Sequence, residues 1–296
     1  MKNTGLYDTS HRVLHQMSDI IEKRGVVMVD FTSSMMHNEE EYISPYSVVA
    51  LCHSGYARSE YDMKPVEFHA HDISVMRPGH VVKNTATSAD YSAQLIVTSA
   101  ACLNTMRQQY LSHHLATQKY FDLQPCQHLN AEQYRQVCDA FRLMRTACSM
   151  EGKYREEMIS STFHTLMVLL SAWRQEMNDN QEDMEHQLLP QFNNAIIEHF
   201  HESREVGFYA RLFHLSPKYF SKRIKQETGA SAGEWIDRYI VLQAKSLLTR
   251  RRDLSIQQIA DRLGFSEQSS LSRFFKTKVG LSPSDFREDL HISAMS

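Results

Sequence analysis

Three histidines in the first third of the chain, His69, His71 and His80, have the spacing that best suits metal chemistry. Residues two apart in a strand face the same side, so His69 and His71 can approach one ion together. The chain holds 16 histidines, however, and chance pairs are correspondingly frequent. A polar role in a ligand pocket or at the surface is the interpretation that the residues favour. We predict neither a bound metal nor another cofactor.

Other patterns that commonly carry catalysis do not occur in the sequence. It contains no glycine-rich phosphate loop and no nucleophile elbow built around a serine. Its five cysteines include no Cys-x-x-Cys pair, and reduced thiols in a cytosolic protein are the simplest interpretation. We therefore expect no catalytic residue and no enzymatic activity.

Lysine, arginine, serine and glutamine gather on two short amphipathic segments near the C-terminus. Phe220 and Ile224, and likewise Leu271 and Phe275, are four residues apart, so each pair faces inward on a helix. This leaves as outward positions Lys218, Ser221, Lys222 and Lys225 in the first segment, and Gln268, Ser269, Ser272, Arg273 and Lys276 in the second. Such faces are typical of helices that bind nucleic acid.

The two segments belong to one pattern that is written twice between residues 205 and 287. In the second copy, Ser255 and Gln258 form a capping box, Gly264 suits a tight turn, and Ser266 is placed to cap the next helix. The first copy repeats this order at an offset of 50 residues, which becomes 51 after one inserted residue. A helix, a short turn and a second helix make a helix-turn-helix, so the duplication predicts two of them.

The second copy resembles the signature of the AraC/XylS transcription regulators. The matching residues are Leu254-Ser255-Ile256, Ile259-Ala260, Leu263-Gly264-Phe265-Ser266, Ser270, Ser272-Arg273-Phe274-Phe275-Lys276, Gly280-Leu281-Ser282-Pro283 and Phe286-Arg287. The resemblance covers about the last 100 residues. It implies two helix-turn-helix subdomains that are joined by a long helix and bind DNA through both recognition helices. Three residues depart from the pattern: His214 in the first turn, Ile240 in place of a frequent arginine, and Leu271 in place of a frequent aromatic residue.

The resemblance also implies which residues contact DNA. The base-reading positions fall on Lys218, Ser221, Lys222, Gln268, Ser269, Ser272 and Arg273. Arginine and lysine pair with guanine and glutamine pairs with adenine, which agrees with these residue types. The phosphate contacts are expected at Lys225, Arg250, Arg251, Arg252, Ser255, Lys276 and Ser282. A solvated surface charge is the alternative for each cation, and the three arginines also suit the negative end of a helix.

The segment between the two helix-turn-helix units predicts a single long helix. Ser231 and Glu234 form a capping box at its start, and apolar residues continue at helical spacing to Leu248. About 17 residues of helix span roughly 25 Å. A spacer of this length can place two recognition helices in successive major grooves, which are roughly 34 Å apart on one face of DNA.

The first hundred residues predict mainly strands. A helix over residues 10–24, ended by Gly25, precedes strands at 26–31, 46–53, 66–70, 73–77, 80–84 and 93–99, which indicates a barrel or sandwich. Residues 68–80 resemble the small cupin-type barrel found at the N-terminus of AraC-family regulators. The metal-binding cupins have a glutamate a few residues after the paired histidines. Here positions 74–76 are Ser, Val and Met.

Three amphipathic helices are predicted to follow, at residues 101–118, 130–149 and 153–178. Apolar stripes run along the last two, formed by Tyr134, Val137, Cys138, Phe141, Met144 and Cys148, and by Ile159, Phe163, Leu166, Met167, Leu170 and Trp173. Such stripes are most often internal core. The resemblance implies a second use, as the contact between two copies of the chain, and both interpretations stay open here.

Length and charge indicate two domains. The chain has 296 residues; residues 191–290 carry 16 Lys/Arg and 12 Asp/Glu, and the remainder carries 16 and 23. We predict a sensing and dimerisation domain over 1–178, with its helical segment at about 101–178, a linker at 179–187 within the polar run 175–187, and a DNA-binding domain over 188–290. The start of the sequence has no signal-peptide pattern, and its apolar runs fall short of the ~20 residues of a membrane span. We expect a cytoplasmic protein without a membrane partner.

The sequence thus predicts a two-domain α+β protein: a cupin-like barrel with helices, then an all-α domain with two helix-turn-helix units. The predicted function is sequence-specific DNA binding in transcription regulation, as an activator on the resemblance alone. Expected partners are double-stranded DNA, a second copy of the chain, RNA polymerase and, with no identity assigned, a small-molecule effector. The alternatives are a cupin-type metal protein or enzyme with a DNA-binding tail, and an architectural nucleoid protein.

Overall fold

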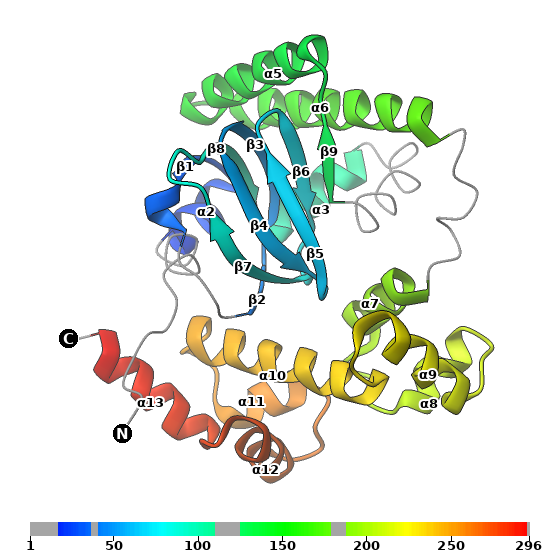
Figure 1. The fold of residues 1–296 in the computed structure, drawn as a ribbon. Coiled ribbons are helices and arrows are strands. Elements are labelled where there is room, and N and C mark those ends of the chain that lie inside the picture. The colour runs from blue at the N-terminus through cyan, green and yellow to red at the C-terminus, as the bar shows by residue number, and fades with distance from the viewer. Residues whose placement is uncertain (1–16, 37–40, 110–124, 179–187, 295–296) are drawn as a thin grey trace. The chain divides into compact units, whose positions relative to one another are not determined.

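The computed structural model describes residues 17–36, 41–109, 125–178 and 188–294 (Figure 1). The chain divides into two compact units, one built mainly from residues 44–186 and the other mainly from residues 187–296. The first unit contains most of two antiparallel sheets with helices, and the second consists mainly of helices. The predicted fold class, a β-sheet domain followed by a helical domain with two helix-turn-helix units, is confirmed. The exact domain boundaries and the cupin likeness stay predictions.

The first unit is built from a five-stranded and a four-stranded sheet. The five-stranded sheet has the order β1 (Val26–Thr32), β8 (Ser92–Thr98), β3 (Ser47–Ser54), β6 (Asp72–Met76) and β9 (Cys126–His128). The four-stranded sheet has the order β2 (Tyr42–Ile43), β7 (Val81–Thr87), β4 (Tyr56–Tyr61) and β5 (Lys64–His69). The strand order in the sheets differs from the order in the chain. Strands β3 and β8 are neighbours in one sheet, whereas the hairpin of β4 and β5, which lies between them in the chain, belongs to the other sheet.

Each of the six predicted strands corresponds to a strand of the structure, whereas β2, β4 and β9 were not predicted. Strand β4 is central in its sheet, yet it reads Tyr-Ala-Arg-Ser-Glu-Tyr and lacks an apolar run. Its inward Ala57 and Tyr61 are buried, and the Ser59 hydroxyl lies 3.0 Å from Asn84 Oδ1. A strand held by such polar contacts has too weak an apolar alternation to be recognised from sequence.

Strand β3 shows where the two cores of the first unit lie. Val49 and Leu51 belong to a core shared with the helices, while Val48, Ala50 and Cys52 belong to a core that includes Ala57 and Phe68 of the four-stranded sheet. Both faces of β3 are therefore covered, and this explains its continuous apolar sequence.

Helices α5 (Ala131–Ser149) and α6 (Arg155–Asn178) lie side by side against the five-stranded sheet, as Figure 1 shows in green. The apolar stripes predicted on them face this sheet: Val137, Phe141 and Met144 are buried, as are Ile159 and Leu166. The interpretation of the stripes as internal core is confirmed. Asn130 caps α5 in a capping box with Gln133, which fixes where the helix begins.

Other predicted elements of this unit are only partly described. Helix α2 (Ser18–Arg24) ends at Gly25 as predicted, and α3 (Ala100–Gln109) matches the start of the predicted helix at 101–118. Residues 10–16 and 110–118 of those predictions, and the linker at 179–187, lie outside the described residues. Helix α6 continues to Asn178, so the polar run 175–187 does not begin as a linker.

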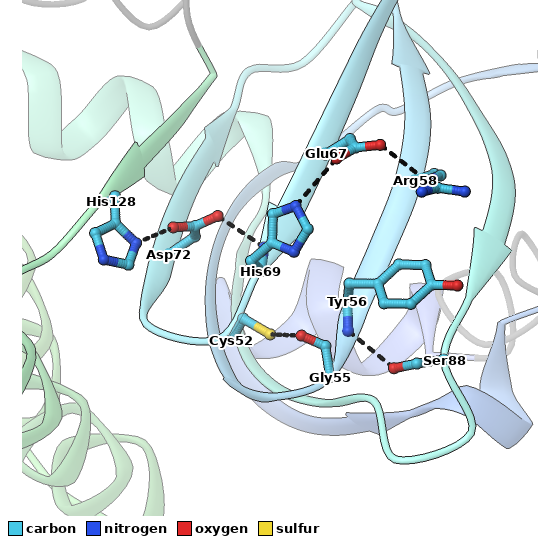
Figure 2. A network of polar contacts seen from close by, with 9 residues as sticks. All are labelled: Cys52, Gly55, Tyr56, Arg58, Glu67, His69, Asp72, Ser88 and His128. Carbon is cyan, nitrogen blue, oxygen red and sulfur yellow. Dashed lines mark hydrogen bonds and ion pairs between the residues drawn. The ribbon is translucent and has the colours of Figure 1, made fainter.

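The shared strand face predicted for His69 and His71 is wrong. Strand β5 ends at His69, and His71 lies in the following turn with φ +70°. Figure 2 shows His69 directed to Glu67, with its Nε2 3.1 Å from a carboxylate oxygen, and Glu67 reaching on to Arg58 at 2.8 Å. Buried Asp72 holds the turn, because it accepts from the backbone N–H of His69 at 2.7 Å and lies 2.7 Å from Nδ1 of His128.

The third histidine of the predicted set, His80, is buried in a different environment. Its Nδ1 lies 2.6 Å from Oδ2 of Asp62, whose other oxygen accepts from the backbone N–H of Val81 at 3.0 Å. The ring of Tyr61 stacks on the imidazole with centroids 5.0 Å apart. This pair joins the β4–β5 turn to the start of β7. Among the described residues, no group of three or more His, Cys, Asp or Glu side chains is placed to hold a metal ion.

The second unit contains seven helices within the described residues. They are α7 (Leu188–His199), α8 (Val206–Leu212), α9 (Pro217–Thr228), α10 (Ala232–Arg250), α11 (Ile256–Arg262), α12 (Gln268–Val279) and α13 (Pro283–Ala294). Its largest fully buried side chain is Trp235 of α10. The indole N–H donates to Oδ1 of Asn193 in α7 over 2.5 Å, so a polar pair joins α7 to α10 inside an apolar core.

This buried hydrogen bond leads to a prediction about stability. Asn193→Leu leaves the Trp235 N–H without its acceptor, and we expect the free energy of unfolding to fall by about 1–3 kcal/mol. Urea unfolding followed by circular dichroism measures the change. The double variant Asn193→Leu with Trp235→Phe removes both partners and should recover part of the loss. A double variant as unstable as the sum of the two single variants would contradict this account.

Candidate nucleic-acid interface

Helix α9 is the second helix of the first helix-turn-helix. Ser216 caps it by accepting from the backbone N–H of Tyr219, and Pro217 occupies its first position, where a missing N–H has no cost. Phe220 and Ile224 are fully buried, as predicted. Phe220 packs edge-on against Phe192 of α7, with ring centroids 4.9 Å apart. The orientation of α9 is therefore set by its two inward residues.

The predicted contact residues of α9 lie on the side away from this core. Lys218, Lys222 and Lys225 are exposed, and Ser221 is half-buried. Tyr219, which is absent from the predicted set, is 50% exposed beside them. The sequence alone indicates the outward position of Tyr219, because this residue does not have helical spacing to the inward Phe220 and Ile224. The helix carries four cations and one carboxylate, and Arg223 lies 3.6 Å from that carboxylate on Glu227.

Helix α12 is the second helix of the second helix-turn-helix, and its predicted cap is wrong. The N-cap is Glu267 rather than Ser266, and its side chain makes no capping bond. The cap comes instead from α11: Oε1 of Gln257 accepts from the backbone N–H of Gln268 over 3.0 Å. Nε2 of Gln257 donates to Asp261 over 2.7 Å, which fixes the direction of the amide. A cap eleven residues away has no signal in the local sequence.

The predicted contact residues of α12, like those of α9, lie on the side of the helix away from the core. Gln268, Ser269, Arg273 and Lys276 are exposed, and Ser272 is half-buried. The inward Leu271 and Phe275 are fully buried, and Phe275 packs edge-on against Phe286 at 5.5 Å. Leu271 and Ile240, two departures from the family pattern, both fill the core. The helix carries three cations and no carboxylate, so its outer face favours an anionic partner.

The third departure, His214, has a conformational consequence. Its φ is +54°, close to the +71° of Gly264 in the matching position of the second copy. Both turns therefore need the left-handed conformation, which histidine adopts more readily than most side chains do. His214 is exposed, and the first turn has room for a side chain there.

The residues predicted to contact phosphate differ in their surroundings. Lys225 and Lys276 lie on the outer faces of the recognition helices. Arg251 is already paired, because its guanidinium donates twice to Asp253 over 2.8 and 2.6 Å. This arginine holds the pKa of Asp253 at about 2, and the carboxylate stays charged through the neutral range. Ser255 and Ser282 act as caps that accept from Gln258 and Asp285.

Helix α10 joins the two helix-turn-helix units as the sequence predicted. Its capping box of Ser231 and Glu234 is present, and the helix has 19 residues, which corresponds to about 28 Å. Hydrogen bonds from Ser231 lower the pKa of Glu234. Nζ of Lys278 lies 2.7 Å from a carboxylate oxygen of Asp237, an ion pair between α12 and α10. One continuous helix thus contacts both recognition helices.

Comparison with known proteins agrees with this geometry. Residues 209–289 match a family described as "Helix-turn-helix domain". They form an AraC-type domain. The chain is 31% identical over 91 residues to the transcriptional activator RhaS of Escherichia coli O139:H28, covering 31% of this chain and 32% of RhaS. It is 29% identical over 150 residues to the arabinose operon regulatory protein of Escherichia coli K12, covering 50% of each.

A solved structure of ToxT from Vibrio cholerae covers 90% of this chain and 98% of its own, at 12% identity and a TM-score of 0.43. The chain spans half or less of the length of the two curated relatives. The resemblance stated from the sequence is confirmed for the AraC-type domain. No described helix is both long and apolar enough to span a bilayer.

The cap from Gln257 gives a prediction specific to the second helix-turn-helix. Gln257→Ala leaves the first turn of α12 without its side-chain acceptor, and loss of such a cap costs about 0.5–2 kcal/mol of unfolding free energy. Thermal or urea unfolding measures it. Gln226→Ala, an exposed glutamine within α9, is the matched control and should leave stability within about 0.5 kcal/mol. Equal stability of the two variants would show that the cap is unimportant.

Proposed function

We propose that this protein binds specific DNA sequences and regulates transcription. The observation that carries the proposal is the duplication: two helix-turn-helix units, each with a cationic and polar outer face, are joined by one continuous helix. Both named relatives are regulators by their printed names. An AraC-type domain that binds DNA through two recognition helices accounts for the duplication, for the names of the relatives and for the cationic and polar residues on α9 and α12.

The base-reading residues are the outward side chains near the start of each recognition helix. These positions reach base edges when such a helix enters the major groove. The proposed set is Lys218, Ser221 and Lys222 on α9, and Gln268, Ser269, Ser272 and Arg273 on α12. Ser269 donates to Glu267 over 3.0 Å and must exchange this bond for a base. Tyr219 joins the set as an apolar surface for a thymine methyl group.

Phosphate binding belongs to the cations at the margins of these faces. Lys225 and Lys276 are exposed on the recognition helices, and Arg250 and Arg252 flank the end of α10. Arg251 donates to Asp253 and must exchange this ion pair for a phosphate. The hydroxyl groups of Ser255 and Ser282 keep a proton to donate while they accept as caps.

The first unit serves in dimerisation and in effector sensing. Leu143 on α5 and Val168 on α6 are 54% and 43% exposed, and both belong to the pair of helices that covers the sheet. Large apolar side chains in this position suit a second copy of the chain. The proposal includes activation through contact with RNA polymerase, in line with the printed name of RhaS. A reporter gene behind the selected site distinguishes activation from repression.

The proposed function predicts that Arg273 reads a base. A bidentate contact of its guanidinium with guanine contributes about 1–3 kcal/mol of discrimination. Arg273→Ala should weaken binding to the duplex selected from random sequence by this amount, and should hardly change binding to a scrambled duplex. Titrations of both duplexes at several salt concentrations measure this.

Changing Arg250 to Arg252 together to glutamine is the contrasting variant. Phosphate contacts lack sequence information, so both duplexes should weaken alike, and the salt slope should fall by roughly 0.9 for each phosphate that is no longer neutralised. Equal weakening on the two duplexes for Arg273→Ala would remove it from the base-reading set. An unmutated protein that does not discriminate the duplexes would instead favour an architectural nucleoid role.

The dimer proposal predicts that negative charges on α5 and α6 separate the two copies. Leu143→Glu with Val168→Glu places two carboxylates on exposed positions, so each copy should still fold while association weakens. Light scattering at tens of micromolar measures the mass. Ile20→Glu, at an apolar residue of α2 that is 49% exposed, is the control and should leave the dimer intact. The dimer proposal is wrong if the unmutated protein is monomeric in this measurement.

A further inference from the structure

The turn of the second helix-turn-helix packs closely against the loop between α7 and α8. A Cβ atom at Gly264 would lie 2.2 Å from the carbonyl oxygen of His201 and 2.8 Å from its carbon. No side chain fits that space, so glycine is required at position 264 for the approach as well as for its φ of +71°. In the matching turn of the first copy, exposed His214 takes the same conformation. Close packing therefore distinguishes the two turns.

The same loop makes another contact with the second helix-turn-helix. The guanidinium carbon of Arg204 lies 3.9 Å from the ring centroid of Phe265, the residue after Gly264. Phe265 is 3% exposed, so one ring face is covered by this arginine. The ring also packs against Phe274 of α12, with centroids 5.4 Å apart. Arg204 is thus one aromatic ring away from the second recognition helix.

The loop is anchored at its other side to the first helix-turn-helix. The hydroxyl of Tyr209 in α8 donates to the backbone carbonyl of Ser203 over 2.9 Å. Tyr209 is fully buried and packs edge-on against Phe192, which also supports Phe220 of α9. Burial of the phenol raises its pKa, so this donor keeps its proton throughout the neutral range. A continuous series of contacts therefore runs from α9 through the loop to α12.

We propose that residues 201–204, seated on Gly264 and Phe265, form a brace that sets the angle between the two recognition helices. Arg204 is then a positioning residue for DNA reading. Helix α10 already contacts the second helix-turn-helix, for example through the ion pair of Asp237 with Lys278. The brace adds a connection from the loop between α7 and α8, and this connection holds the second recognition helix against turning relative to the first. This inference rests on the proposed function, because two helices need a fixed angle only when both enter one DNA duplex.

The test compares duplexes that differ only in spacing. The probe is the duplex selected with the unmutated protein. It is compared with duplexes that have one base pair added or removed between the two DNA segments that the recognition helices contact. Arg204→Ala should weaken binding at the native spacing by about 2- to 5-fold, the amount expected from an exposed cation–π contact. Binding at the altered spacings should change less, so the preference for the native spacing shrinks.

Matched variants separate the brace from other roles. Phe265→Leu keeps an apolar side chain but removes the ring face, so it should reduce the preference for the native spacing as Arg204→Ala does. The double variant should reduce this preference no further. Arg204→Ala should also leave the salt dependence unchanged. Equal weakening at all spacings, or a shallower salt slope that indicates a phosphate contact, would overturn the brace. Failure of the proposed function is a separate outcome, in which the unmutated protein does not distinguish the selected duplex from a scrambled one.

Discussion

The burial of two side chains on each recognition helix is the constraint on which the DNA-binding unit depends. A helix of twelve residues is marginal by itself in water, and α9 and α12 have this length. Phe220 with Ile224, and Leu271 with Phe275, supply the apolar contact that holds them. Because these pairs sit on one side, the opposite side is free to carry lysine, arginine, serine and glutamine.

The ends of these helices are stabilised by different means in the two copies. Ser216 caps α9 from within its own turn, whereas Gln257 caps α12 from the preceding helix. The turns also differ, since the first carries the side chain of His214 and the second places Gly264 against a carbonyl group. The duplicated sequence has thus kept one geometry and changed the contacts that support it. The second helix-turn-helix relies more on distant parts of the chain.

The first unit distributes its apolar residues between two cores. Strand β3 contributes alternate side chains to each, and this is possible because a second sheet covers one face and α5 with α6 cover the other. Three described histidines of this unit serve the fold in their observed places. Asp72 and Asp62 hold His128 and His80 by hydrogen bonds, and His71 supplies a left-handed turn residue.

The sequence by itself determined the elements whose signals are local. The capping boxes at Ser231 and Ser255, the inward pairs of both recognition helices and six strands all follow from short-range spacing. Periodicity and capping act within a few residues, so they can be recognised without knowing the fold. The outward placement of the proposed contact residues follows from the same periodicity.

Only the tertiary structure decided the features that depend on distant residues. The cap from Gln257, the central strand β4 and the contact of Arg204 with Phe265 join segments that no local pattern relates. It also placed His69, His71 and His80 apart, because a turn after His69 interrupts the two-residue alternation of a strand. Spacing in sequence becomes proximity in space only while the regular element continues, and the fold decides where it ends.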